Sequence, residues 1–236
     1  MRGIVAIASG AGGVRGYVGT PMLGGTDNQA GLTLPDAVGR GGAVQIVKNH
    51  PDWPRPYNGI TAIRHGDVDR DIGIYLAESE QRSCALAAAT SITGILCKAA
   101  GGYLIEQLPD VTPETVQRVE ENLAKLVKQD GGERLPTNLL LHGVTPLEIA
   151  QIILQGLDME VLQQIEPKAV CECSEDRLVR SLRLLPRADV DDILEKEERV
   201  EARCQFCGKV YRIEAADVRE RLAQTSTTTG HGEQES

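Results

Sequence analysis

Two close pairs of cysteines, thirty residues apart, constrain this chain more than any other feature of its sequence. The first pair is Cys171-Glu172-Cys173, and the second is Cys204-Gln205-Phe206-Cys207, which is followed by Gly208. Each pair can offer two sulfurs to one metal ion, and two such pairs together complete the closed four-cysteine site that structural zinc favours. Without the metal, each pair is free to form a disulfide. The sequence therefore predicts one small module with sulfur at both ends.

The rest of the composition limits the compartment and the partners. Of the 236 residues, 41% are hydrophobic and 3% are aromatic, so we expect a main domain and a smaller one with aliphatic cores. The net charge of -9 opposes binding to nucleic acid or anionic membranes, and we expect neither partner. No apolar run is long enough to span a membrane, and the start has the features of neither a secretory signal nor a transit peptide. We therefore expect reduced cysteines and a cytoplasmic protein, in which paired cysteines are more often metal ligands or redox groups than structural bridges.

The element pattern predicts an α+β fold with a β-rich core domain over residues 1–111. Short strand-like runs joined by turns fill this range, and residues 19–42 are expected to form a loop. The glycines at 10–13 fit a hairpin turn better than a dinucleotide loop, because Arg15 stands where the third glycine is required. The segment 71–77 suits either a strand or the start of a helix. Glycines inside the strand expected near Gly101 indicate a bulge or a close backbone approach.

Helical patterns dominate from residue 112 onward. Residues 112–165 predict a helical linker of short amphipathic pieces, with capped starts at Thr112-Pro113-Glu114 and Thr145-Pro146. Residues 166–222 predict a small zinc-binding α+β module, with helices expected after caps at Ser174 and Asp189, then two strands and a terminal helix. Residues 223–236 predict a disordered tail.

The remaining residue patterns leave three functional classes open. Residues 174–203 hold nine acidic and seven basic residues and few apolar ones, so we expect the metal to supply much of the folding free energy of the module, on the order of 10 kcal/mol. A static zinc ribbon and a redox switch are both compatible with that expectation. A dithiol oxidoreductase fits the sequence less well, because strand-like residues rather than a helix follow Cys207. Cys84 and Cys97 are expected to be buried, and no catalytic constellation involves the four histidines (His50, His65, His142 and His231), so we expect no enzyme.

In these cysteine pairs the chain resembles the heat shock protein 33 family, the redox-regulated holdase chaperones also called 33 kDa chaperonins. Further segments resemble the family in its order, from near residue 3 to about residue 222: Val14–Val18, Tyr75–Gln81, Ala100–Pro109 and Leu185–Leu194. The family chain normally begins several tens of residues earlier, so we expect the core domain to be N-terminally incomplete. A lost upstream transit peptide would make a plastid or a mitochondrion the alternative location. A proline usual in the family after Ser79-Glu80-Gln81 is replaced here by Arg82-Ser83-Cys84.

The resemblance implies a mechanism for the four thiols. In the reduced form Cys171, Cys173, Cys204 and Cys207 would hold one Zn²⁺ per chain, and the chaperone would be inactive. Oxidation would release the metal and form the disulfides Cys171–Cys173 and Cys204–Cys207. The zinc module and the linker would lose structure, and the active homodimer would bind unfolding client proteins without ATP. The asymmetric pairing of a CxC with a CxxC favours this switch over the static ribbon.

Overall fold

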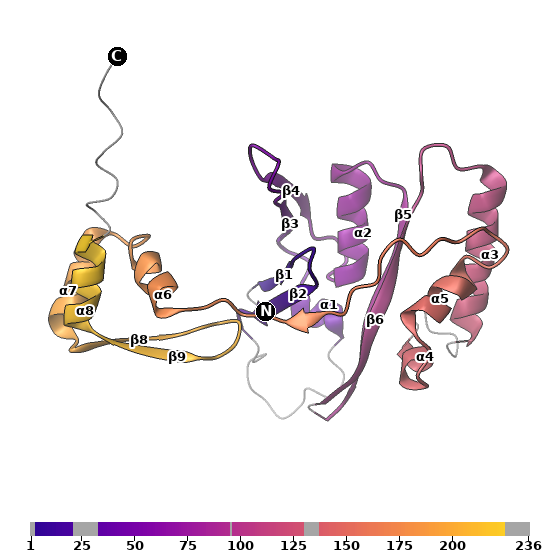
Figure 1. Ribbon diagram of the computed structural model, residues 1–236. Helices are drawn as coiled ribbons and strands as arrows, with labels where there is room; N and C mark the ends of the chain where they lie inside the picture. The colour runs from indigo at the N-terminus through magenta and orange to yellow at the C-terminus, as the bar shows by residue number, and fades with distance from the viewer. Residues whose placement is uncertain (1–2, 21–32, 95, 130–136, 225–236) are drawn as a thin grey trace, which may run out of the picture. The chain divides into compact units, whose positions relative to one another are not determined.

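The computed structural model describes residues 3–20, 33–94, 96–129 and 137–224 (Figure 1). Contacts divide the chain into two units. Unit 1 comprises Met22–Gln163 with Met1, and unit 2 joins Arg2–Pro21 to Gln164–Ser236. Both units mix helices and strands, which confirms the predicted α+β class. None of the described helices is both long and apolar enough to cross a membrane.

Unit 1 is built around a long antiparallel hairpin. Its strands are β3 (Ala43–Lys48), β4 (Tyr57–Ala62), β5 (Cys84–Thr93) and β6 (Leu96–Glu106), and its helices are α1 (Leu34–Val38), α2 (Val68–Ser79), α3 (Pro113–Gln129), α4 (Thr137–Leu141) and α5 (Pro146–Ile153). The β5–β6 hairpin separates α2 from α4 and α5 (Figure 1). On it, a Cβ at Gly102 would lie 2.8 Å from Ala88 Cα, so the prediction of a close backbone approach is confirmed.

The helices after residue 112 pack closely on this hairpin. Leu126 of α3 and Ile149 and Ile153 of α5 are buried together, with Tyr103 and Ile105 of β6 packed against them. The range 112–165 was expected to consist of short pieces, but α3 has 17 residues and no regular element follows Ile153 before the module. The boundaries 1–111, 112–165 and 166–222 remain predictions.

Unit 2 combines the N-terminal hairpin with the cysteine module. Its strands are β1 (Ile4–Ala8), β2 (Gly13–Val18), β7 (Lys168–Ala169), β8 (Arg199–Arg203) and β9 (Val210–Glu214), and its helices are α6 (Glu175–Leu182), α7 (Arg187–Lys196) and α8 (Ala215–Gln224). The turn between β1 and β2 confirms the predicted hairpin, because Gly12 N donates to Ser9 O at 3.0 Å. β2 also pairs in parallel with β7, so residues far apart in sequence share one three-stranded sheet.

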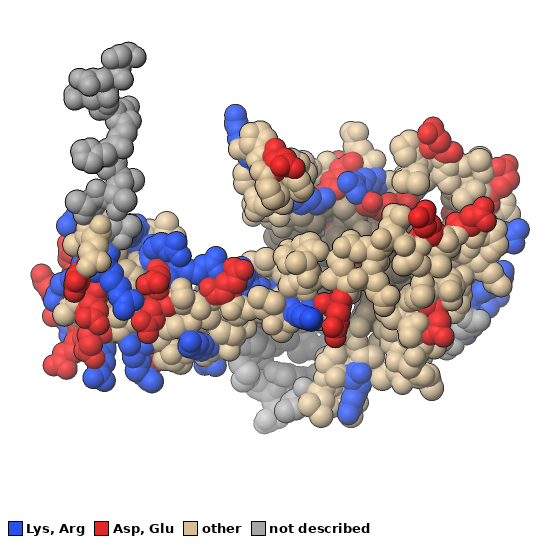
Figure 2. Space-filling view, in the orientation of Figure 1, with Lys and Arg blue, Asp and Glu red and all other residues tan. Residues whose placement is uncertain are grey.

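The module has a hydrophobic core of its own, which the sequence reading underestimated. Seven residues are buried together: Val179, Val190, Leu194, Val200, Ile213, Ala215 and Val218. They come from α6, α7, α8, β8 and β9, and charged side chains cover much of the face of the module that Figure 2 shows. The expectation that few apolar residues pack this segment is therefore wrong, because one or two residues from each of five elements converge on one core.

The structure corrects three local expectations and decides a fourth that the sequence left open. Helix α1 lies inside the expected loop, where Thr33 and Asp36 form a capping box. The ambiguous segment 71–77 is helical, as part of α2. Helix α7 begins at Arg187, and Asp189 lies in its first turn rather than at its cap. Cys97 is exposed and Cys84 is half-buried, so neither is the buried residue expected. The tail predicted over 223–236 falls almost wholly outside the described residues.

Candidate metal centre

The first cysteine pair lies between a strand and a helix start. β7 ends at Ala169, and Val170 N donates to Val14 O at 3.0 Å just before Cys171. On the other side Ser174 caps α6, because its hydroxyl accepts from Arg177 N at 3.2 Å. The backbone is thus fixed immediately before and after the pair, as the predicted Ser174 cap required.

The second pair occupies the turn between β8 and β9. Cys204 N donates to Lys209 O at 2.9 Å, and Gly208 N donates to Cys204 O at 2.8 Å. Gly208 has a φ of 75°, a conformation that a residue without Cβ adopts at little cost. These bonds fold the chain tightly around Cys204 and Cys207, which explains the glycine directly after the pair.

The structure brings all four predicted sulfurs together. The Sγ atoms of Cys171, Cys173, Cys204 and Cys207 all lie within 4.8 Å of one another. The contacts between the pairs are 3.6 Å for Cys171–Cys204 and 3.4 Å for Cys173–Cys207, and all four thiols are free. With Zn–S bonds of about 2.3 Å, the edge of a tetrahedral site is about 3.8 Å. The observed spacing fits such a site.

The pKa values within the cluster also favour a bound cation. Backbone N–H groups, that of Cys207 first and then that of Phe206, outweigh desolvation and lower the pKa of Cys204 to about 6. The N–H of Cys173 favours the Cys171 thiolate, but desolvation and the neighbouring sulfurs outweigh it and raise the pKa of Cys171 to about 12. Four adjacent thiolates repel one another, so the cluster can hold all its negative charge only around a cation.

Tyr211 supports the centre from β9, although the sequence reading did not single it out. Its hydroxyl lies 2.8 Å from Cys173 O and 3.1 Å from Cys173 Sγ. The hydrogen bond from the Tyr211 hydroxyl to the Cys173 sulfur is the largest cause of the lowered pKa of Cys173. The alternation of apolar and polar residues along β9 could have indicated an inward-facing Tyr211, because Tyr211 and Ile213 are the two buried residues of that strand.

The other candidate ligands lie elsewhere. Cys84 begins β5 and Cys97 lies near the start of β6, so they occupy opposite ends of the hairpin. Among the described residues, the only cluster of three or more potential metal ligands is the four-cysteine one. His50 packs beside Trp53, and His231 lies outside the described residues.

Comparison with known proteins decides the family. The family model described as Hsp33 protein matches residues 1–214. This chain belongs to the Hsp33 family. Its relatives named 33 kDa chaperonin include one from Clostridioides difficile strain 630, which is 33% identical over 94% of this chain and 74% of its own length. Another, from Gloeothece citriformis strain PCC 7424, is 34% identical over 95% of this chain and 72% of its own.

A solved Hsp33 structure shares the fold. The 33 kDa chaperonin of Thermotoga maritima superposes with a TM-score of 0.73 at 22% identity, over 95% of this chain and 74% of that one. The family match and the names of these relatives, which are chaperonins and not enzymes, place this chain in a chaperone family. Its four cysteines lie close enough together to hold a metal ion.

Proposed function

We propose that this chain is a redox-regulated chaperone that binds unfolding proteins without ATP and is controlled by its cysteine centre. The gathering of four sulfurs from two distant pairs, within 4.8 Å, is the observation that carries the proposal. Cys171, Cys173, Cys204 and Cys207 would hold one Zn²⁺ per chain. When bound, the ion would keep the four thiolates charged and tie both ends of the module together.

The cysteine side chains would carry out the switching step. Each pair of thiolates would give two electrons to one hydrogen peroxide, which takes up two protons from the solvent, so that one disulfide and two waters form. Two peroxides thus convert one chain to Cys171–Cys173 and Cys204–Cys207. Disulfide sulfurs are poor metal ligands, since the thiolate is the binding form, and the two ends of the module are no longer joined. Cys171 and Cys207 are exposed, which gives a small oxidant access to both pairs.

Unit 1 offers a surface suited to unfolded clients. A groove of about 900 Å³ runs between the end of the β5–β6 hairpin, α3 and the segment after α5, and is lined by Leu108, Val116, Val119, Leu123 and Leu157 among others. Leu108 is 74% exposed, a large apolar surface for a folded protein to leave in water. We propose that such apolar surface receives unfolded segments once the oxidised form dimerises. The cytoplasm is the proposed location.

A static zinc-ribbon protein is the second candidate. The seven-residue core of the module favours it, because that core stabilises the fold without any change of redox state. The two candidates differ in what peroxide does. A static site would lose stability when oxidised and gain no activity.

The test measures aggregation of a chemically unfolded client. Reduced, zinc-loaded protein should leave aggregation unchanged, and protein treated with peroxide at mildly raised temperature should suppress it. A variant with Cys84→Ser and Cys97→Ser should behave like the original chain, because neither thiol belongs to the cluster. Strong suppression by the reduced protein, or none by the oxidised one, would contradict the proposal.

A further inference from the structure

Side chains on one face of β2 contact residues that lie inside both cysteine pairs of unit 2. Residues two apart in a strand point to the same side, so Arg15 and Tyr17 share a face of β2. Both meet Phe206, the residue just before Cys207. The Tyr17 and Phe206 rings meet edge to face with centroids 5.0 Å apart, and Arg15 Cζ lies 5.2 Å from the Phe206 centroid.

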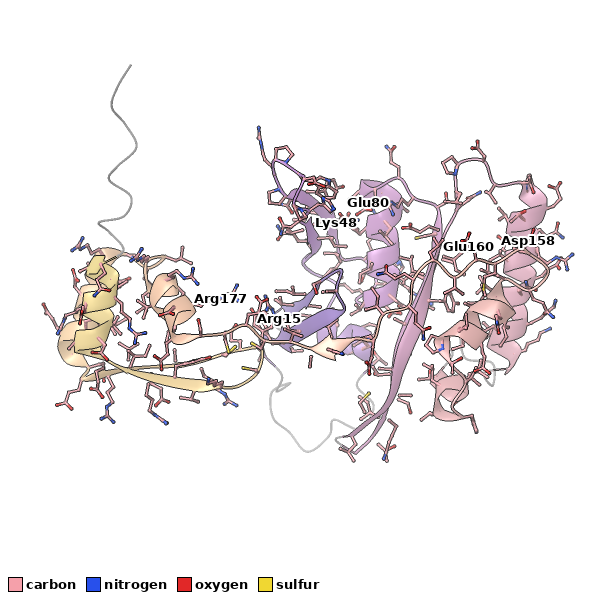
Figure 3. The ribbon with its side chains drawn as sticks, viewed as in Figure 1. Arg15, Lys48, Glu80, Asp158, Glu160 and Arg177 are labelled. Carbon is pink, nitrogen blue, oxygen red and sulfur yellow. The ribbon has the colours of Figure 1, made fainter. Side chains whose placement is uncertain are left out.

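The same arginine also reaches the other pair. Arg15 Nη1 lies 3.7 Å from a carboxylate oxygen of Glu172, the residue between Cys171 and Cys173. Arg177 binds that carboxylate as well, with Nη1 3.0 Å from the same oxygen, so Glu172 bridges two guanidinium groups. The two arginines are labelled in Figure 3. Both arginines border a cavity of about 450 Å³ beside the thiols, which is also lined by Cys171, Cys173, Cys204 and Phe206.

We propose that Arg15 is a positioning residue that links the N-terminal hairpin to the redox state of the cysteine centre. Its guanidinium contacts Glu172 in the first pair and Phe206 in the second, and the backbone of the same strand holds the approach to Cys171, because Val170 N donates to Val14 O at 3.0 Å. This inference rests on the proposed function, because it concerns the regulation of that site.

Disulfide formation changes the backbone at the residues that Arg15 contacts. Two extended residues span about 6.6 Å between Cα atoms, whereas a disulfide places its Cα atoms about 5.5–6 Å apart. Closing Cys171 onto Cys173 therefore bends the chain at Glu172 and turns its carboxylate. The same closure in the second pair displaces Phe206. Contacts made in one state and lost in the other stabilise the first, so Arg15 favours the reduced form.

The Arg15 side chain is largely buried, so neighbouring atoms fix its position. Its side chain is 24% exposed, and Nε is buried with no hydrogen-bond partner among the described residues. A buried donor without an acceptor lowers stability, so Nε is not what holds this side chain in place. The guanidinium contributes instead a charge and a planar face, which are what Glu172 and Phe206 contact.

The experiment compares Arg15→Ala and Arg15→Lys with Arg199→Ala in the full chain. Arg199 is the matched control, because it pairs with Glu214 at 2.6 Å in the same module and neither partner is a neighbour of a cysteine. Reduced, zinc-loaded proteins are treated with a fixed peroxide concentration, and zinc release is followed with a coloured chelator. We expect Arg15→Ala to release zinc about tenfold faster than the original chain, which corresponds to about 1.4 kcal/mol. The rate of zinc release from Arg15→Lys should lie between those of Arg15→Ala and the original chain. The rate for Arg199→Ala should equal that of the original chain.

Hydrogen exchange of the β1–β2 amides provides a second measurement. In the original chain these amides should be protected when reduced and should exchange faster after oxidation. In reduced Arg15→Ala they should already exchange faster. Equal release rates for Arg15→Ala and the original chain, or equal acceleration by Arg199→Ala, would overturn the inference. If the original chain binds no zinc or gains no activity on oxidation, the proposed function fails instead, whatever the variants do.

Discussion

Gly59 of β4 lies against the ring of Tyr75, whose side chain is completely buried. A Cβ at Gly59 would lie 2.8 Å from Cε2 of that ring, which cannot move without disturbing α2. We predict that Gly59→Ala lowers the free energy of unfolding by about 1–3 kcal/mol, as overpacking does. Gly73→Ala in α2 is the control, because nothing lies within 4 Å of its Cβ and it should stabilise by about 1 kcal/mol. Denaturant unfolding measures both; a harmless Gly59→Ala would mean that the ring is free to shift.

Glu80 is a buried carboxylate that makes stability depend on pH. Burial alone would raise its pKa, but hydrogen bonding and charge from Lys48, with smaller contributions from Tyr75 and Arg82, hold the pKa below the usual 4.5 (Figure 3). A pKa that is lower in the folded state adds stability above the unfolded value and loses it as pH falls through the folded value. We predict that thermal stability falls as pH drops below about 4.5. Glu80→Gln should flatten this dependence, and an unchanged slope would exclude Glu80 as its source.

At the scale of elements, one buried amide joins α3 to the end of α5. Asn122 is 1% exposed, and its Nδ2 donates to Ile153 O at 3.0 Å and Gln155 O at 2.9 Å. We predict that Asn122→Ala lowers the free energy of unfolding by about 2 kcal/mol, because two carbonyls lose their donor. It should also raise protease cleavage after Ile153. Gln117→Ala, on the exposed side of α3, should leave both unchanged, and equal effects of the two variants would contradict the assignment.

For the whole molecule, the core of the module limits what metal removal can do. Its seven buried residues pack without the sulfurs, so we predict that a chelator with reductant opens the cysteine turns and leaves that core folded. Amides at 171–174 and 204–209 should exchange faster, whereas those of Val200, Ile213 and Val218 should stay protected. Amides around Leu126 in unit 1 serve as the internal control. Simultaneous exchange of the whole module would restore the view that the metal supplies its folding free energy.

The sequence by itself determined the candidate site and much of the element order. Metal ligands here come as two local pairs, and the glycine after Cys207 and the cap at Ser174 are signals within a few residues of them. Short-range patterns of this kind report local backbone geometry, and the hairpin at 4–18 followed from the same reasoning. Helix α1 was missed although its capping box, Thr33 and Asp36, was readable.

Only the tertiary structure decided which distant segments meet. The contacts of Arg15 and Tyr17 with Phe206 join residues nearly the whole chain apart, and no spacing or propensity encodes them. The core of the module likewise draws one or two apolar residues from each of five elements, which the sequence shows only as scattered positions among charges. Cys97 is exposed because of its place in the β5–β6 hairpin, which the local sequence does not show. These three outcomes have the same physical reason. Burial and side-chain contact depend on how the whole chain folds in space, whereas local sequence patterns determine only the backbone conformation of each short segment.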